Sequence, residues 1–328
     1  MNSPQERLNQ IAVWHTAQEH AKIKAAIEAL PAAERSDELL SLLARALFNE
    51  DEFPAALETL DGIADRSGDE PWYCLRRALT LWQMNREDEA LPWFLKAQSL
   101  GLEEIDELPG TYFPKSVSKW VERAEMWAPR RVKMKSFEAQ RRSARSKTPV
   151  DAKFSAQDLA GLWDDSEYSL SQYTGATPTA EDFAAIETEL GFRLPGAYKS
   201  LIQLRNGGIL ARNCYPNALR RDWTTEAFSV ESIFGVDRSK PYSLCGSRGS
   251  KFWIEEWRYP EIGIAIADTI SAGHQMIFLD YSDCGPDGEP CVVSVNQESN
   301  YEISYVADNF AEFIRGLEPS EDEELDDD

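Results

Sequence analysis

Two short helices, each with a start and a stop signal, are encoded between residues 179 and 208. Thr179 can cap the first helix, because Asp182 stands three residues later in the position of a capping box. Gly191 ends that helix. Pro195 suits the first turn of the second helix, where its missing N–H is not needed. The apolar residues of each helix fall on one face, which predicts packing on a core: Phe183, Ile186 and Leu190, then Tyr198, Leu201 and Ile202.

Asn206, Gly207 and Gly208 follow, and they predict the left-handed conformations that end the second helix. The pattern E-x2-L-G-x2-L-P-x2-Y, which begins at Glu187, and the N-G-G after it resemble the opening signature of the SUKH superfamily, the Smi/Knr-type proteins. Further blocks resemble bacterial members of this family in the same order: residues 273–280, 285–290, 292–293 and 309–314.

The resemblance implies binding rather than chemistry. Many bacterial SUKH proteins look like immunity proteins that neutralise polymorphic toxins, often nucleases or deaminases, and the yeast relatives regulate cell-wall synthesis. The positions shared with the family are mostly glycine, proline and apolar core residues, so no catalytic residue carries over. We therefore expect a protein that binds another protein and is not an enzyme.

The second half of the chain also has the pattern of an α+β domain. Short segments rich in β-branched residues suit strands: 228–236, 262–267, 275–281, 291–295 and 301–306. Asn309 and Glu312 can cap a final helix. Helices before and after one mostly antiparallel sheet predict an α+β domain over residues 154–317.

The first half carries an internal repeat. Residues 37–70 align with residues 71–104 at a period of 34. Small residues recur where the two helices of a hairpin approach closely: Ala44 with Ala78, and Ala56 with Ala90. The region resembles tetratricopeptide repeats, and residues 8–30 suit a degenerate first hairpin. The sequence therefore predicts an all-α domain over residues 1–128.

A stack of about three hairpins offers a concave surface on which a second protein or peptide could bind. Aromatic residues could line such a surface: Trp72, Tyr73, Trp82, Trp93 and Phe94. Aromatic residues at helical spacing belong more often to a core, so they define no peptide pocket. Two residues depart from the repeat pattern: Asp51, where a turn glycine is common, and Pro92 inside a helix.

Charge is spread unevenly along the chain, whose formal net charge is −23. Residues 115–153 carry 12 basic and 4 acidic side chains, against 10 and 21 in residues 1–114 and 12 and 32 in residues 154–328. The acidic regions repel nucleic acid and anionic membranes and attract cationic proteins. Residues 318–328 hold eight acids and no base, which predicts a disordered tail that attracts a cationic partner at long range.

The basic stretch at residues 129–153 is interpreted as a linker. It is either solvated or held against acidic residues, because both flanking regions would repel the same polyanion. Nucleic-acid binding through this stretch is the alternative, since clustered lysine and arginine side chains bind phosphates.

Apolar runs, the first residues and the spacing of cysteine and histidine bear on the compartment and on cofactors. No apolar run approaches the roughly 18 residues that a membrane-spanning helix needs, and the first residues lack the pattern of a signal peptide. The five cysteines are irregularly spaced, which favours reduced thiols. Cys284 and Cys291 lack the second short-spaced pair of a zinc site, and His274 is the only histidine near them in sequence. We expect a cytoplasmic protein with no cofactor and no membrane partner.

The candidate binding residues combine acids with aromatic side chains: Trp253, Glu255, Glu256, Trp257 and Glu261. Such a mixture is typical of a protein-binding patch. The competing interpretation is a half-buried element whose tryptophans point into the core, because large apolar side chains are usually buried. The sequence leaves both interpretations open.

Two hypotheses about function remain. In the first, an immunity protein uses its acidic SUKH domain to occlude the cationic cleft of a nuclease or deaminase toxin. In the second, a regulatory scaffold or adaptor joins one partner on the repeats to another on the SUKH domain. The sequence identifies neither the partner nor the binding face.

Overall fold

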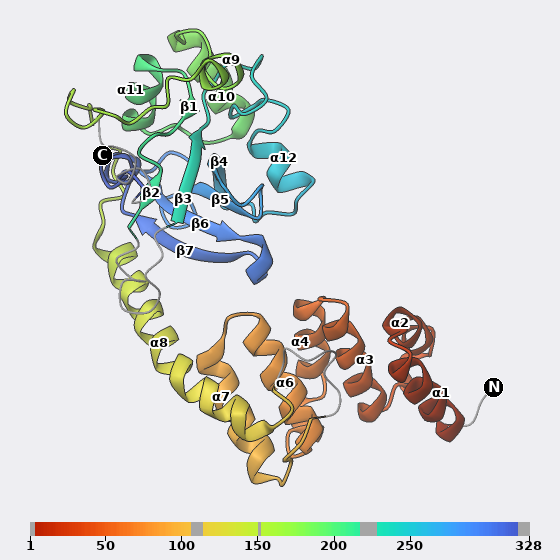
Figure 1. The fold of residues 1–328 in the computed structure, drawn as a ribbon. Coiled ribbons are helices and arrows are strands. Elements are labelled where there is room, and N and C mark those ends of the chain that lie inside the picture. Colours follow the sequence, from red (N-terminus) through yellow and green to blue (C-terminus); the bar gives the residue numbers. More distant parts are fainter. Residues whose placement is uncertain (1–3, 106–113, 150–151, 217–227, 321–328) are drawn as a thin grey trace, which may run out of the picture. The chain divides into compact units, whose positions relative to one another are not determined.

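The computed structural model describes residues 4–105, 114–149, 152–216 and 228–320 (Figure 1). The chain divides into two compact units, Met1–Ser136 and Phe137–Asp328. The division falls between the two boundaries expected from the sequence, residues 128 and 154, which stay predictions.

The first unit is built from helices: α1 (Pro4–Thr16), α2 (His20–Glu28), the 3-10 helix η1 (Ala32–Glu34), α3 (Asp37–Asn49), α4 (Phe53–Asp61), α5 (Ala64–Ser67), α6 (Pro71–Gln83), α7 (Glu87–Ser99) and the first part of α8 (Val117–Ala144). Neighbouring helices form hairpins, α1 with α2, α3 with α4, and α6 with α7. Contacts of α2 with α3 and of α4 with α6 stack the hairpins. This arrangement is consistent with helical repeats.

The turns of the three hairpins share one geometry. Gln18, Asp51 and Asn85 have φ angles of 57°, 59° and 53°, which places each in the left-handed region. The residue after the turn donates its N–H to a carbonyl five residues earlier, as Glu52 does to Leu47 at 2.9 Å, and the equivalent bonds in the other hairpins measure 2.8 and 2.9 Å. Asp51 serves in place of glycine because a short polar side chain tolerates this conformation.

The core of the first unit follows the repeat. The small residues Ala44, Ala78, Ala56 and Ala90 are all buried, which lets the helices approach closely. α7 continues through Pro92. Trp120 of α8 completes the core. Its ring stacks on that of a buried phenylalanine, with 5.5 Å between the ring centroids.

The second unit is an α+β domain. Its helices are the last part of α8, α9 (Glu167–Gln172), α10 (Ala180–Leu190), α11 (Gly196–Leu204), α12 (Ser250–Glu255), the 3-10 helix η2 (Gln297–Ser299) and α13 (Phe310–Arg315). Its strands are β1 (Gly208–Ile209), β2 (Cys214–Tyr215), β3 (Phe228–Ile233), β4 (Gly263–Thr269), β5 (Gln275–Asp280), β6 (Cys291–Asn296) and β7 (Glu302–Ala307). The predicted fold class is therefore confirmed.

One sheet forms the centre of this unit. Its strand order is β1-β3-β4-β5-β6-β7, β2 also pairs with β3, and every pair is antiparallel (Figure 1). All seven residues of β4 are buried, because this strand lies inside the sheet with side chains packed on both faces. The predicted segments at 262–267, 275–281, 291–295 and 301–306 match β4 to β7 within two residues at each end.

α10 begins with the predicted capping box. The N–H of Asp182 donates to the Thr179 hydroxyl (3.3 Å), and the N–H of Thr179 donates to the Asp182 carboxylate (2.8 Å). Gly191 ends the helix with a left-handed φ of 76°. Pro195 is the N-cap of α11, one position earlier than the sequence predicts.

The end of α11 differs from the prediction. The helix stops at Leu204, before Asn206, and of the two glycines only Gly207 is left-handed, with a φ of 81°. Gly208 is the first residue of β1. The N-G-G sequence therefore turns the chain into the sheet rather than capping a helix, because β1 must align beside β3.

The predicted linker and the predicted disordered tail each begin with some regular structure. α8 continues to Ala144, so the first part of the expected linker at 129–153 is helical. Glu318, the first residue of the expected tail, exchanges two backbone hydrogen bonds of 2.8 and 2.9 Å with Cys214. The rest of that prediction falls mainly on residues 321–328, which lie outside the described residues.

Candidate functional site

The candidate patch lies on α12 and the turn after it, and Trp253 belongs to the core there. Its side chain is only 5% exposed, and its Nε1 donates a hydrogen bond of 3.0 Å to the carbonyl of Arg248. Its ring meets those of Phe252 and Trp257 edge-on, with centroid distances of 5.0 and 5.2 Å. α12 also contacts β4 (Figure 1). The buried Trp253 therefore holds this helix against the sheet.

Trp257 also packs inward in part. It is half-buried, and its ring lies edge-on to that of His274, with 5.7 Å between centroids. Its carbonyl accepts a hydrogen bond of 2.5 Å from the Tyr301 hydroxyl. A Cβ on Gly273, whose φ is 96°, would lie 2.6 Å from the Trp253 ring, so only glycine allows this approach. Both tryptophans therefore support the fold of this corner.

The three acids of the patch face solvent. Glu255, Glu256 and Glu261 are exposed, and no described residue forms a hydrogen bond or ion pair with their carboxylates. Because Trp253 anchors α12, Glu255 and the adjoining Glu256 are presented from a fixed position. We define these three side chains as the acidic patch. Free carboxylates on a fixed support suit a cationic protein surface.

The signature residues have internal partners. Tyr198 is fully buried, and its hydroxyl donates a hydrogen bond of 2.5 Å to the carbonyl of Phe234. Asn206 accepts the N–H of Val236 (2.7 Å) and donates to the carbonyl of Ala176 (2.6 Å). These bonds tie three separate segments together, so the signature serves the fold rather than a ligand.

A hollow of about 330 Å³ lies beside Asn206, and the sequence did not predict it. Asp182 and Asp237 line it. A hydrogen bond from Ser239 lowers the pKa of Asp237, and one from the backbone of Thr179 lowers the pKa of Asp182, so both carboxyls are ionised at neutral pH. Asp182 has an evident capping role and Asp237 comes from a distant segment, so no local pattern joins them.

The carboxyl of Asp268 is buried inside the sheet. Asp268 of β4 is 5% exposed and lies opposite Ser232 of β3, whose hydroxyl donates to Oδ1 at 2.5 Å. Burial raises the pKa of Asp268 to about 7; the Ser232 hydrogen bond opposes the rise and the Glu231 carboxylate adds to it. Among the described residues, no cation pairs with Asp268. This acid therefore titrates near neutral pH in the folded protein.

Arginine side chains at the end of the basic stretch form ion pairs with carboxylates of the second unit. Arg142 pairs with Asp280 at 2.9 Å, and Arg145 pairs with Asp283 and donates to the carbonyl of Glu289 at 2.6 Å. The Arg145 side chain is fully buried. A nucleic-acid phosphate would have to displace these partners, which disfavours the nucleic-acid alternative for this segment.

The described residues offer little for metal or thiol chemistry. No three His, Cys, Asp or Glu side chains among them converge as the ligands of a metal ion would. Burial raises the pKa of Cys245 and of Cys291 to about 12, so both thiols stay protonated at neutral pH and are poor nucleophiles. Over the same residues, none of the helices combines the length and apolar character needed to cross a bilayer.

The second unit is thus an α+β domain that offers free carboxylates at its surface. Residues 177–316 match the model of the SMI1 / KNR4 family (SUKH-1), which confirms the predicted resemblance for this segment. The match begins just before α10 and ends just after α13. No curated protein and no solved structure matches the chain.

Proposed function

We propose that the second unit is a protein-binding domain without a catalytic role, and that it neutralises a basic toxin of the nuclease or deaminase class. The SUKH-1 match at residues 177–316 carries this proposal, because the resemblance to SUKH immunity proteins implies a protein partner. The balance of 32 acidic to 12 basic side chains in residues 154–328 supports a cationic partner.

In this proposal the acidic patch takes the place of nucleic-acid phosphates. Glu255, Glu256 and Glu261 meet the cationic substrate cleft of the toxin, and the bulk of the domain then blocks access to it. Complementary charge mainly speeds association and selects the partner, so the contact depends on ionic strength. Asp182 and Asp237, which line the hollow beside Asn206, extend the acidic character of the domain.

The test is association with a basic toxin domain of the nuclease or deaminase class; a large secreted protein with a basic C-terminal domain, if one is encoded beside this chain, would supply it. The variant Glu255→Gln/Glu256→Gln/Glu261→Gln should slow association at low salt by about tenfold, because rim charges act on the association rate. The matched control, Glu167→Gln/Glu181→Gln/Glu298→Gln, removes three exposed acids elsewhere on the same unit. Equal losses in the two variants would refute the acidic patch as the contact surface.

The alternative function is a scaffold that joins two partners. Each unit has its own hydrophobic core, so each can offer a separate binding surface. If the chain bound no such toxin domain and instead retained several proteins of its own cell, this alternative would replace the immunity function.

A further inference from the structure

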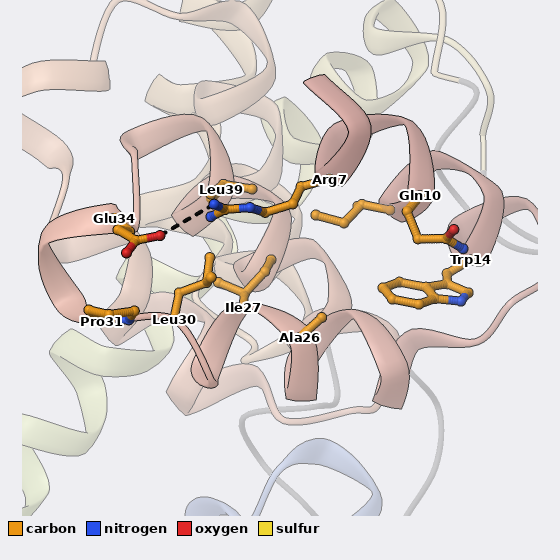
Figure 2. A pocket seen from close by; sticks show the side chains of 10 residues that line it. Arg7, Gln10, Trp14, Ala26, Ile27, Leu30, Pro31, Glu34 and Leu39 are labelled. Carbon is orange, nitrogen blue, oxygen red and sulfur yellow. Dashed lines mark hydrogen bonds and ion pairs between the residues drawn. The ribbon is translucent and has the colours of Figure 1, made fainter. Parts of the chain in front are cut away.

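An apolar hollow opens in the first repeat hairpin. It measures about 460 Å³ and is lined mainly by apolar side chains of α1, of α2 and the turn after it, and of the start of α3: Ile11, Trp14, Ala26, Ile27, Leu30 and Leu39. Figure 2 shows Trp14 with Gln10 on one side and Leu30 with Pro31 and Glu34 on the other. Arg7 and Glu34 form an ion pair of 3.3 Å at its edge.

At the next hairpin junction a tyrosine stands at the equivalent position, and the hollow of about 500 Å³ beside it is lined mostly by polar and charged side chains. Tyr73 is the repeat counterpart of Leu39, 34 residues later, and it is only 1% exposed. Its hydroxyl donates a hydrogen bond of 3.2 Å to the carbonyl of Leu60, and its ring meets Trp93 edge-on at 5.8 Å.

The backbone around the hollow has the same turn conformation and hydrogen bonds as the backbone around Tyr73. Ile27 lies nine residues after the left-handed Gln18, as Leu60 lies nine residues after Asp51. The carbonyls of Ile27 and Leu60 each accept a hydrogen bond from the backbone N–H three residues later, at 3.1 and 3.2 Å. The hollow therefore lies where an aromatic side chain sits in the following repeat, and Leu39 is too short to reach across it.

The surroundings of the hollow are acidic. A smaller hollow of about 270 Å³ shares Arg7, Glu34 and Leu39 with it and adds Glu38. Glu38 is exposed, and no described residue pairs with its carboxylate, whereas Arg7 is already paired with Glu34. The wider region agrees, since residues 1–114 carry 21 acidic and 10 basic side chains. A segment that enters here is favoured if it carries positive charge.

We propose that this hollow is a docking site for a tyrosine side chain on a basic segment of a partner protein. The ring occupies the space that Tyr73 fills in the next repeat, and the hydroxyl donates to the Ile27 carbonyl. A lysine or arginine beside the tyrosine pairs with Glu38. Aromatic side chains suit such a site because they bury a large area at low entropic cost. The inference concerns the first unit and does not depend on the function proposed for the second.

The probes are p-cresol, which represents the tyrosine side chain, and three acetylated and amidated peptides, Lys-Lys-Tyr-Lys-Lys, Lys-Lys-Ala-Lys-Lys and Glu-Glu-Tyr-Glu-Glu. With the full chain, p-cresol and the basic tyrosine peptide should shift the methyl NMR signals of Ile11, Ile27, Leu30 and Leu39. The alanine and acidic peptides should bind at least about tenfold more weakly. Equal binding of the three peptides would overturn the proposal.

The decisive variant is Leu39→Tyr, which places the aromatic ring in the hollow from within. It should abolish the shifts caused by p-cresol. Val13→Tyr is the control, because Val13 lies on α1, is 61% exposed and does not line the hollow. Ala26→Leu narrows the hollow from α2 and serves if Leu39→Tyr does not fold. Undiminished p-cresol binding in a folded Leu39→Tyr or Ala26→Leu variant would also overturn the proposal.

Discussion

The hydroxyl of Ser232 donates a hydrogen bond of 2.5 Å to the carboxyl of Asp268, between the neighbouring strands β3 and β4. The bond links two buried polar groups inside the sheet. Because burial raises the pKa of Asp268 to about 7 in the folded protein, against an ordinary value of 3.8, the folded state favours the protonated acid.

This relationship predicts the pH dependence of stability. Between about pH 4 and pH 7 the folded state binds more protons at Asp268 than the unfolded state, so the free energy of unfolding falls as pH rises through this window. Asp268→Asn keeps an acceptor for Ser232 without the charge. Urea unfolding at pH 8 should show the variant about 2–4 kcal/mol more stable than the wild type, with little difference at pH 4. Glu256→Gln, at an exposed site, should change neither value. Equal pH profiles for wild type and Asp268→Asn would contradict the account.

Gly207 is predicted to stabilise the second unit. Its φ is 81°, and a Cβ there would lie 2.7 Å from the backbone nitrogen of Gly235, so Gly207→Ala meets both backbone strain and a clash. Its free energy of unfolding should fall by about 2 kcal/mol or more. Gly191→Ala is the control, because Gly191 has a φ of 76° but a Cβ there would meet no atom within 4 Å, and it should cost about 1 kcal/mol. A Gly207→Ala protein that kept its melting temperature yet lost its partner would instead identify a contact loop.

Arg145 is predicted to stabilise the second unit. Its fully buried side chain pairs with Asp283, so Arg145→Met leaves that carboxylate without its main partner. The loss should be about 3 kcal/mol in the free energy of unfolding of the second unit, measured with urea. Lys147→Met is the matched control, because Lys147 is 44% exposed and reaches the same carboxylate only at 3.7 Å; its effect should stay below about 0.5 kcal/mol. Similar losses in both variants would show that the Arg145 pair adds nothing beyond surface charge.

Tyr73 provides an internal test of the repeat comparison. Tyr73→Phe should lose about 1 kcal/mol, since it removes the hydroxyl that donates to the Leu60 carbonyl and accepts from Arg77 at 3.3 Å, but keeps the ring. Tyr73→Leu should lose about 2–4 kcal/mol, because it also leaves a cavity like the one beside Leu39. Thermal unfolding measures the losses, and p-cresol titration should reveal a second binding site in Tyr73→Leu alone. If the two variants were equally stable, the ring would not fill the junction as argued.

Signals that act over a few residues could be interpreted from the sequence. The Thr179–Asp182 capping box and the Gly191 stop involve atoms within one or two helical turns, so the sequence that encodes them also determines their geometry. The same holds for strands β4 to β7, whose β-branched residues suit a pleated sheet wherever it forms. The left-handed turns of the hairpins recur because each lies within a short, self-contained loop.

The candidate site could be predicted only in part. The sequence showed acids beside tryptophans between residues 253 and 261, but whether a tryptophan points inward depends on what lies opposite it. Gly273 leaves the space into which Trp253 packs, and Gly273 lies on another segment. The repeat alignment already pairs Leu39 with the larger Tyr73. Only the structure shows that the Tyr73 ring packs between two hairpins, and therefore that Leu39 leaves a hollow at the equivalent place.

The sequence by itself determined the class of each half, the caps, the strands and the acidic character that favours a cationic partner. Only the tertiary structure decided that Arg145 is buried against Asp283, that Asp182 and Asp237 share one hollow, and that Asp268 lies buried beside Ser232. The reason is physical: burial, and the pKa shifts and ion pairs that follow from it, depend on groups brought together from distant parts of the chain, and no local pattern encodes those encounters.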